Sequence, residues 1–354
     1  MTDLEKLCSR VTEAADCAVI TDDVNRRYFT AMKSSAGTLV AFPEKAYFII
    51  DFRYIEKAKK TVTACEVILQ DKLYEQINSL IKKHGAKTVS VNADTCTLSE
   101  LIAYQQKLNA EVIADTKLAE IIREIRTVKS QEQIDKIIKA QRIAEKGFAH
   151  MLDFIRVGRT EKEIQLELDY YMLKNGAEAL SFDTIALSGS NTSLPHGVPS
   201  DKKVESGEFV LMDFGATYDG WHSDMTRTVC VGKPSDKMKS VYETVLTAQL
   251  SALDAVKAGM SGKALDKIAR DIITEAGYGD NFGHSLGHGV GVEIHESPYA
   301  SPSREDILPE NSIVTVEPGI YLEGKFGVRI EDFVVVTENG CINMTKAPKE
   351  LICL

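Results

Sequence analysis

The sequence has no disulfide or thiolate pattern, no cluster of basic residues and no long apolar segment. Its seven cysteines are an odd number and none forms a Cys-x-x-Cys pair, which favours buried thiols in a reduced, cytoplasmic compartment. A net charge of −10 without clustered Lys and Arg argues against a nucleic-acid surface. No apolar signal segment opens the chain, and no stretch approaches the ~20 apolar residues of a membrane span.

Three common catalytic patterns are incomplete. The Asp-Phe-Gly at 213–215 occurs in kinases, but there is no Gly-rich loop followed by a strand lysine and no His-Arg-Asp. The Gly-rich segment 283–291 is not followed by the Gly-Lys-Ser/Thr of a phosphate-binding loop, and His295-Glu296 lacks the second histidine of H-E-x-x-H. These gaps argue against a kinase, a P-loop NTPase and a zincin.

The length of 354 residues is sufficient for two domains, each with its own core. Residues 1–120 alternate short apolar runs with helical patterns, which predicts an α/β domain with a helix-covered sheet. The second domain is placed at 121–354, and a capping box at Ser130 begins its first long helix. The strands predicted for the first domain are 17–20, 38–42, 46–50, 88–91 and 111–113.

Two aspartates eleven residues apart organise the second domain. Asp213 and Asp224 each lie in a short apolar run, and the turn-forming pair Asp219-Gly220 separates the runs. This pattern predicts a β-hairpin with one inward-facing carboxylate on each strand. A carboxylate in an apolar environment is costly unless a cation or a proton compensates its charge.

The chain then repeats this arrangement. Glu317 and Glu331 lie in similar runs, 104 and 107 residues after the two aspartates, and the helical regions 158–176 and 259–277 also correspond. Such self-similarity indicates an internal duplication of roughly a hundred residues. Helices that precede strands, twice, predict an α+β domain in which a pseudo-twofold brings both acidic hairpins to one site.

Histidines join the four acids in the sequence pattern. His284, His288 and His295 fall within twelve residues, and the glycines beside His288 allow a close backbone approach. His196 lies in a separate loop bracketed by proline and glycine.

Charge counting favours a pair of metal ions at this cluster. Four carboxylates and a neutral imidazole carry −4, which one divalent ion leaves at −2. Two divalent ions with a shared hydroxide leave −1, which a neighbouring His or Arg can balance. Oxygen ligands with one imidazole suit Mn, Co, Fe or Zn, and a two-metal site of this kind predicts hydrolysis of an amide or related bond.

These motifs together resemble the pita-bread metallopeptidases, which include methionine aminopeptidase, aminopeptidase P and prolidase. The family pieces, all in order, are Asp-x-Gly with a second Asp, Gly-His-Gly-x-Gly, Glu-Pro-Gly and Arg-Ile-Glu-Asp. The resemblance implies a creatinase-like N-terminal domain, a pita-bread catalytic domain and two divalent ions, Mn or Co in preference to Zn or Fe. It makes the metal ligands Asp213, Asp224, His288, Glu317 and Glu331, with Asp224 and Glu331 bridging.

The same resemblance implies roles for the surrounding residues. Glu317 would also move the proton between the attacking water and the leaving amine. His196 and His295 resemble the histidines that hold the substrate carbonyl and stabilise the tetrahedral intermediate. His284 resembles a substrate-pocket histidine of the proline-specific members. Tyr321 and Arg329 resemble the network that braces the Asp213 side of the site.

The N-terminal segments 25–30 and 51–54 resemble the domain that precedes the catalytic domain in aminopeptidase P and prolidase. Methionine aminopeptidases lack that domain, and creatinase lacks the metal ligands. The main prediction is therefore an Xaa-Pro aminopeptidase acting on proline-containing peptides, and the resemblance implies a homodimer. The alternative is an Xaa-Pro dipeptidase, which needs a cation such as Arg304 or Lys325 near the product-side carboxylate.

Two further possibilities are weaker. A non-catalytic binding module with this fold would be expected to have lost metal ligands, and here all five are kept. Hydrolysis of a small non-peptide amide or guanidine is disfavoured for the same reason.

Overall fold

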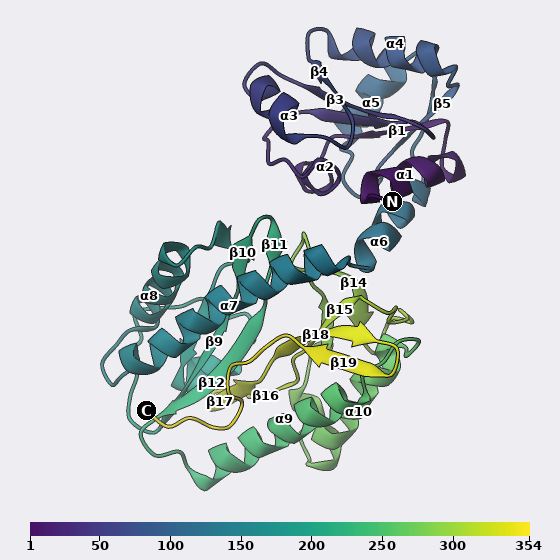
Figure 1. Cartoon of the computed structure of the whole chain (residues 1–354). Helices are drawn as coiled ribbons and strands as arrows, with labels where there is room; N and C mark the ends of the chain where they lie inside the picture. The colour runs from purple at the N-terminus through teal and green to yellow at the C-terminus, as the bar shows by residue number, and fades with distance from the viewer. The chain divides into compact units, whose positions relative to one another are not determined.

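The structure, a computed structural model, describes all 354 residues and divides into two compact units, Met1–Arg126 and Thr127–Leu354 (Figure 1). The boundary placed at residue 120 from the sequence falls inside helix α6 (Lys117–Thr127). Leu118 and Ile121 of this helix lie in the core of the first unit, so the unit extends to the end of the helix. None of the helices combines the length and the hydropathy that crossing a membrane requires.

A six-stranded mixed sheet forms the centre of the first unit, in the order β4-β3-β2-β1-β5-β6. The pairs β1–β2 and β2–β3 are antiparallel, and β3–β4, β1–β5 and β5–β6 are parallel. The strands are β1 (Cys17–Ile20), β2 (Thr38–Ala41), β3 (Ala46–Ile50), β4 (Glu66–Leu69), β5 (Thr88–Val91) and β6 (Glu111–Ile113). The helices are α1 (Asp3–Arg10), η1 (Val11–Glu13), α2 (Asp23–Thr30), α3 (Ile55–Thr61), α4 (Leu73–His84), α5 (Leu98–Lys107) and α6.

Helices cover both faces of this sheet, as the sequence predicted. Ile20 and Phe48 pack on one face with α1 and α6, whereas the neighbouring Val19 and Ile49 pack on the other with α4 and α5. This alternation follows from the two-residue period of a strand. The edge strand β4 was not predicted, because both of its end residues are exposed and the apolar run is short.

The second unit contains the long helices and the acidic hairpins. Its helices are α7 (Gln131–Phe154), α8 (Glu161–Lys174), η2 (Gly189–Ser193), α9 (Asp236–Ala255), α10 (Gly262–Glu275) and η3 (Gly279–Asn281). Its first strands are β7 (Ala179–Leu180), β8 (Ile185–Ser188), β9 (Glu208–Phe214), β10 (Ala216–Tyr218), β11 (Trp221–His222) and β12 (Met225–Val231). The later strands are β13 (Gly287–Gly289), β14 (Glu296–Ala300), β15 (Ile313–Val316), β16 (Gly319–Leu322), β17 (Phe326–Arg329), β18 (Asp332–Thr337) and β19 (Gly340–Asn343).

The two halves of this unit repeat one arrangement. In the first half, β9 pairs antiparallel with β12, and the small pair β10–β11 lies between them in sequence. In the second half, β15 pairs with β18 and encloses β16–β17 in the same way. Asp219 and Gly220 both have positive φ, as a tight hairpin turn of the primed type requires. Each hairpin packs on its own pair of adjacent helices, α7–α8 or α9–α10 (Figure 1).

A buried ion pair joins the two hairpins. Arg227 on β12 donates to Asp332 at the start of β18 (Nη2 to Oδ1, 2.7 Å), and both side chains are almost completely buried. Arg227 also donates to the carbonyl oxygens of Glu331, Ala347 and Pro348, and the Glu331 amide donates to the Thr226 carbonyl. The ion pair therefore holds together the strand ends beside Asp224 and Glu331.

Substitution Arg227→Met is expected to lower the free energy of unfolding by about 3 kcal/mol, because it leaves the buried Asp332 carboxylate without its closest guanidinium. Urea unfolding followed by the fluorescence of Trp221, the only tryptophan and a residue of the second unit, measures this change. The matched control is Lys267→Met, which removes an exposed ion pair to Asp271 and is expected to change stability by less than about 0.5 kcal/mol. Similar losses in both variants would contradict the role of the buried pair.

Candidate metal centre

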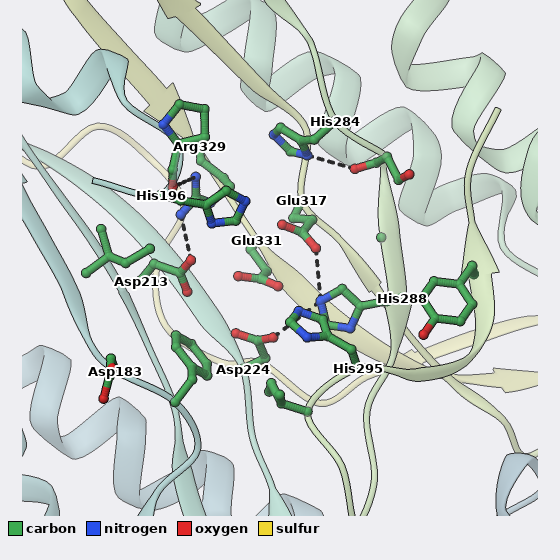
Figure 2. Close-up of a pocket in the computed structure, with 17 residues that line it drawn as sticks. Asp183, His196, Asp213, Asp224, His284, His288, His295, Glu317, Arg329 and Glu331 are labelled. Atoms are coloured by element: carbon green, nitrogen blue, oxygen red, sulfur yellow. Dashed lines mark hydrogen bonds and ion pairs between the residues drawn. The ribbon is translucent and has the colours of Figure 1, made fainter. Parts of the chain in front are cut away.

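The structure brings the five predicted ligands together, from both halves of the second unit, around a cavity of about 480 Å³ (Figure 2). Four of the five lie at the ends or immediate flanks of strands. Asp224 and Glu331 directly precede β12 and β18, although the sequence analysis placed them within strands. The other three are Asp213 near the end of β9, His288 in the middle of β13 and Glu317 directly after β15.

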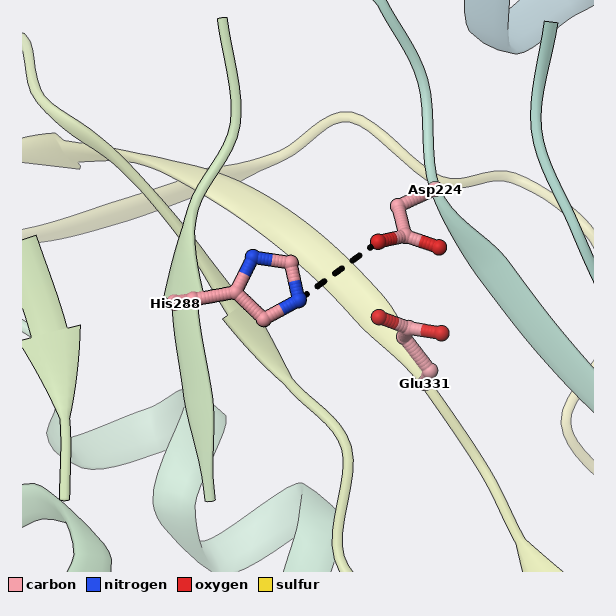
Figure 3. Close-up of side chains that lie close together, drawn as sticks. All are labelled: Asp224, His288 and Glu331. Carbon is pink, nitrogen blue, oxygen red and sulfur yellow. Dashed lines mark ion pairs between the residues drawn. The ribbon is translucent and has the colours of Figure 1, made fainter. Parts of the chain in front are cut away.

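The closest group consists of Asp224, His288 and Glu331 (Figure 3). One potential ligand atom from each lies within 4.8 Å of the others. His288 Nε2 is 3.6 Å from Asp224 Oδ2 and 3.2 Å from Glu317 Oε1. Because His288 Nδ1 donates to the Gly289 carbonyl (3.1 Å), the ring is held with Nε2 toward the acids, the usual orientation of a metal-binding imidazole.

Two carboxylates of the cluster are only half satisfied. Asp213 Oδ2 accepts from Arg329 (2.6 Å), while its buried Oδ1 has no hydrogen-bond partner. Glu331 Oε2 accepts from Thr226 Oγ1 (2.8 Å), and its buried Oε1 likewise has no partner. Buried carboxylate oxygens without partners are costly, and a bound cation would compensate both. This donor set, four carboxylates and one imidazole, therefore fits divalent metal ions.

Shifts in pKa reflect the crowding of negative charge. Burial raises the pKa of Asp224 well above its usual range, and the Asp213 charge raises it further. Burial and the Asp224 charge do the same to Glu331. Burial lowers the pKa of His288, but its hydrogen bond to Glu317 and the nearby negative charges outweigh this effect and raise it to about 9. Without a metal, the cluster therefore holds protons in place of cations.

Glycines place His288 by direct backbone contact, as the sequence suggested. A Cβ atom at Gly287 would lie 2.0 Å from the Thr315 carbonyl oxygen, and one at Gly289 would lie 2.4 Å from the Ser297 carbonyl oxygen. Both distances are far below contact, so only glycine fits on either side of His288.

Arg329 is the centre of the predicted bracing network. Besides Asp213, it donates to Tyr321 Oη (2.7 Å) and to Thr226 Oγ1 (3.0 Å). Tyr321 in turn lies 2.9 Å from His284 Nε2, and His284 Nδ1 lies 2.8 Å from the Ser285 carbonyl. Both ring nitrogens of His284 are thus engaged within the protein, and the residue also lines the cavity, where its predicted substrate contact stays a prediction.

His196 and His295 both line the cavity (Figure 2). The His295 ring contacts the His288 ring edge to face, at a centroid distance of 4.3 Å. Burial, followed by the charge of His288, lowers the pKa of His295, so this imidazole is neutral at neutral pH. His196 is exposed on its loop, beside the Pro195 carbonyl that accepts a hydrogen bond from Arg329 (3.4 Å).

Two threonines that contact the acids were not predicted from the sequence. Thr226 donates to Glu331, and Thr315 donates to Glu317 Oε1 (3.1 Å). Each lies two residues from an acid of its own hairpin, so the two-residue period of a strand places them on the same face and could have revealed them. The apolar and aromatic wall of the cavity was not predicted either, because its residues follow no periodic pattern. It consists of Phe182, Ile185, Ile294 and Tyr299.

Comparisons with known proteins agree with this geometry. The model of metallopeptidase family M24 matches residues 135–338, and that of the creatinase/prolidase N-terminal domain matches residues 4–128. A Pyrococcus furiosus protein named Xaa-Pro dipeptidase is 40% identical, with 99% of each chain covered.

Solved structures extend this similarity. One titled Xaa-Pro dipeptidase, from Bacillus anthracis, has a TM-score of 0.95 and 42% identity over 99% of each chain. An X-Pro aminopeptidase from Thermotoga maritima has a TM-score of 0.91 and 39% identity, covering 96% of this chain and 98% of that one. The predicted creatinase-like domain, pita-bread fold and dependence on divalent metal are thereby confirmed. The chain is a metallopeptidase and belongs to metallopeptidase family M24.

Proposed function

We propose that this metallopeptidase is an Xaa-Pro dipeptidase, which hydrolyses the bond between the first residue and the proline of a dipeptide. The observation that supports the proposal is similarity over almost the whole chain, at 40% and 42% identity, to two proteins named for that activity. The comparisons thus favour the alternative over the aminopeptidase that was the main prediction from the sequence.

An Xaa-Pro aminopeptidase is the second candidate, supported by the Thermotoga maritima structure and by the charges around the cavity. Arg329 is the only Lys or Arg that lines the cavity, and its guanidinium is already bound to Asp213. A dipeptide carries its carboxylate one residue beyond the cleaved bond, whereas a longer peptide has a neutral amide there. The absence of an available cation in the lining favours the longer substrate.

The five clustered residues would hold two divalent ions, Mn or Co in preference to Zn or Fe. When bound, the ions would activate a water molecule and polarise the scissile carbonyl. Burial raises the pKa of Glu317, but the hydrogen bond and charge of His288 outweigh this effect and lower it, so its carboxylate is ionised at neutral pH. Glu317 would pass a proton from the attacking water to the leaving proline nitrogen.

Two histidines would act on the substrate carbonyl. His295 is neutral and lies at the cavity wall, where it can donate a hydrogen bond to the developing oxyanion without adding a charge. His196 would approach from the opposite loop (Figure 2). Arg329 would keep Asp213 oriented toward the ions while holding Tyr321 and Thr226 in place.

Binding of Mn²⁺ to the metal-stripped protein is expected to release protons and to strengthen as pH rises from 6 to 8. The pKa values of Asp224, Glu331 and His288 are raised, so the empty cluster holds protons that metal must displace. Calorimetric titration in two buffers of different ionisation enthalpy counts the released protons. Each released proton is expected to increase the affinity for Mn²⁺ about tenfold per pH unit.

Substitution Asp224→Asn should abolish both metal binding and peptide hydrolysis. Affinity independent of pH, or full activity of this variant, would contradict the assigned site.

Hydrolysis of Ala-Pro beside Ala-Pro-Ala, with Mn or Co restored, separates the two candidate functions. A dipeptidase is expected to cleave Ala-Pro at least about tenfold more efficiently, by kcat/KM, because its site binds the free carboxylate next to the cleaved bond. Preferential cleavage of the tripeptide would establish the aminopeptidase instead. Cleavage of neither, with metal bound, would reject proline specificity altogether.

Of the two cations named from the sequence, Arg304 lies nearer the cavity, although it is not among the residues that line it. Its guanidinium lies 4.0 Å over the ring of Tyr299, which lines the cavity, whereas Lys325 lies in the turn between β16 and β17. Substitution Arg304→Ala is expected to raise KM for Ala-Pro about tenfold, the effect of one lost charged hydrogen bond, with kcat within about twofold. Steady-state kinetics with Lys325→Ala as the matched control tests this. An equal effect of both variants, or none, would exclude Arg304.

A further inference from the structure

A completely buried carboxylate lies outside the metal cluster at the start of helix α8. Glu161 has no exposed surface and is the first residue of that helix. Its Oε1 accepts hydrogen bonds from the amide and hydroxyl of Ser188 (2.7 and 3.2 Å) and from Asn191 Nδ2 (3.0 Å). Its Oε2 accepts from the amide and hydroxyl of Ser200 (3.0 and 2.6 Å) and from Asn191 Nδ2 (3.2 Å). All of these donors come from one segment of the chain.

That segment carries His196. Ser188 ends β8 and Ser200 lies beyond the loop, so the carboxylate joins the two sides of residues 189–199. The part of the loop around His196 has little core packing, since the side chains of Leu194 and Val198 are mostly exposed, whereas Thr192 nearer its start is buried. Its position therefore depends on how its two ends are held.

The charge of Glu161 is stabilised without a counter-ion. No Lys or Arg forms an ion pair with it, and the surrounding donors are neutral amides and hydroxyls. The position at the helix N-terminus adds the favourable field of the backbone amides. The two oxygens of a carboxylate together offer about four acceptor sites, so these donors can be accepted at once.

The repeated half shows that the fold itself does not require this carboxylate. The bridges Thr160–Lys203 and Ser261–Ile307 occupy equivalent places before α8 and α10. The residue that corresponds to Glu161 is Gly262, where an added Cβ atom would lie 1.9 Å from the Tyr299 carbonyl oxygen. The acid thus occurs only in the half that carries the His196 loop.

The far side of the loop contacts the catalytic network. Thr192 Oγ1 accepts a hydrogen bond from the Gly327 amide (2.8 Å), and the Pro195 carbonyl accepts one from Arg329. Both contacts lie between the two loop ends that Glu161 joins.

We propose that Glu161 is a positioning residue, which ties the ends of the 188–200 segment together so that His196 faces the cavity. This inference rests on the proposed function, because the contribution of His196 is read through peptide hydrolysis. Glu161 touches neither substrate nor metal ligand and acts only through the loop.

A double-mutant cycle tests this role. Substitution Glu161→Gln is expected to lower kcat/KM for the best Xaa-Pro peptide at least about tenfold in the native background, because an amide group cannot accept all of these hydrogen bonds. In a His196→Ala background the same substitution should cost less than about twofold, since residues that act through one another are not additive. Equal losses in both backgrounds would overturn the proposal.

The matched control is Glu163→Gln. Glu163 lies on the same helical turn and caps Thr160, but it contacts nothing in the 188–200 segment. Its activity is expected to stay within about twofold of the native protein. If Glu161→Gln does not fold, Ser200→Ala removes the hydroxyl donor to Oε2 (2.6 Å), one of the six hydrogen bonds that Glu161 accepts, and should show the same background dependence with a smaller loss.

Hydrogen exchange gives a readout that does not depend on activity. Amides of residues 189–200 should exchange about tenfold faster in Glu161→Gln, while those of α9 stay unchanged. If the native protein cleaves no Xaa-Pro peptide, the proposed function fails but this measurement still decides whether Glu161 holds the loop. Unchanged exchange in the segment would refute the positioning role in either case.

Discussion

The electrostatic repulsion among four buried or largely buried carboxylates is the constraint on which the catalytic unit depends. Asp224 and Glu331 are pushed toward their protonated forms, and Asp213 and Glu331 each keep one buried oxygen without a partner. The protein stabilises this arrangement only partly, through Arg329 and the His288–Glu317 contact. Divalent cations complete the compensation, so metal binding and the architecture of the unit are two parts of one electrostatic balance.

The duplication of the hairpins allows the fold to stay stable despite this concentration of charge. Each half has its own apolar core and helix pair, so the acids meet only where the halves join. There Arg227 and Asp332 form an internal ion pair beside the cluster, and backbone hydrogen bonds join the strand ends. The two apolar cores stabilise the unit, and the catalytic residues lie at the boundary between its two halves.

Much of the fold and of the metal centre could be predicted from the sequence, because the sequence patterns that indicate them are local and repeated. The hairpin turn at Asp219-Gly220, the helix caps and the spacing of the four acids all predicted features that the structure contains. The edge strand β4 was missed because it lacks a buried face, and the engagement of both His284 nitrogens could not be foreseen because their partners are distant in sequence. Substrate length could not be predicted for a similar reason, since it depends on which side chains reach the cavity across loops.

The contacts of Gly287 and Gly289 have a consequence for how this protein tolerates change. The backbone on either side of His288 lies directly against the backbone of Thr315 and Ser297. No side chain lies between them that could shift to make room for a larger residue. A methyl group added there would displace the imidazole from the acids, whereas a neighbouring apolar side chain can exchange for another of similar volume. In the centre of this enzyme the smallest residues are therefore the least replaceable, and sequence drift is expected to accumulate in the large ones first.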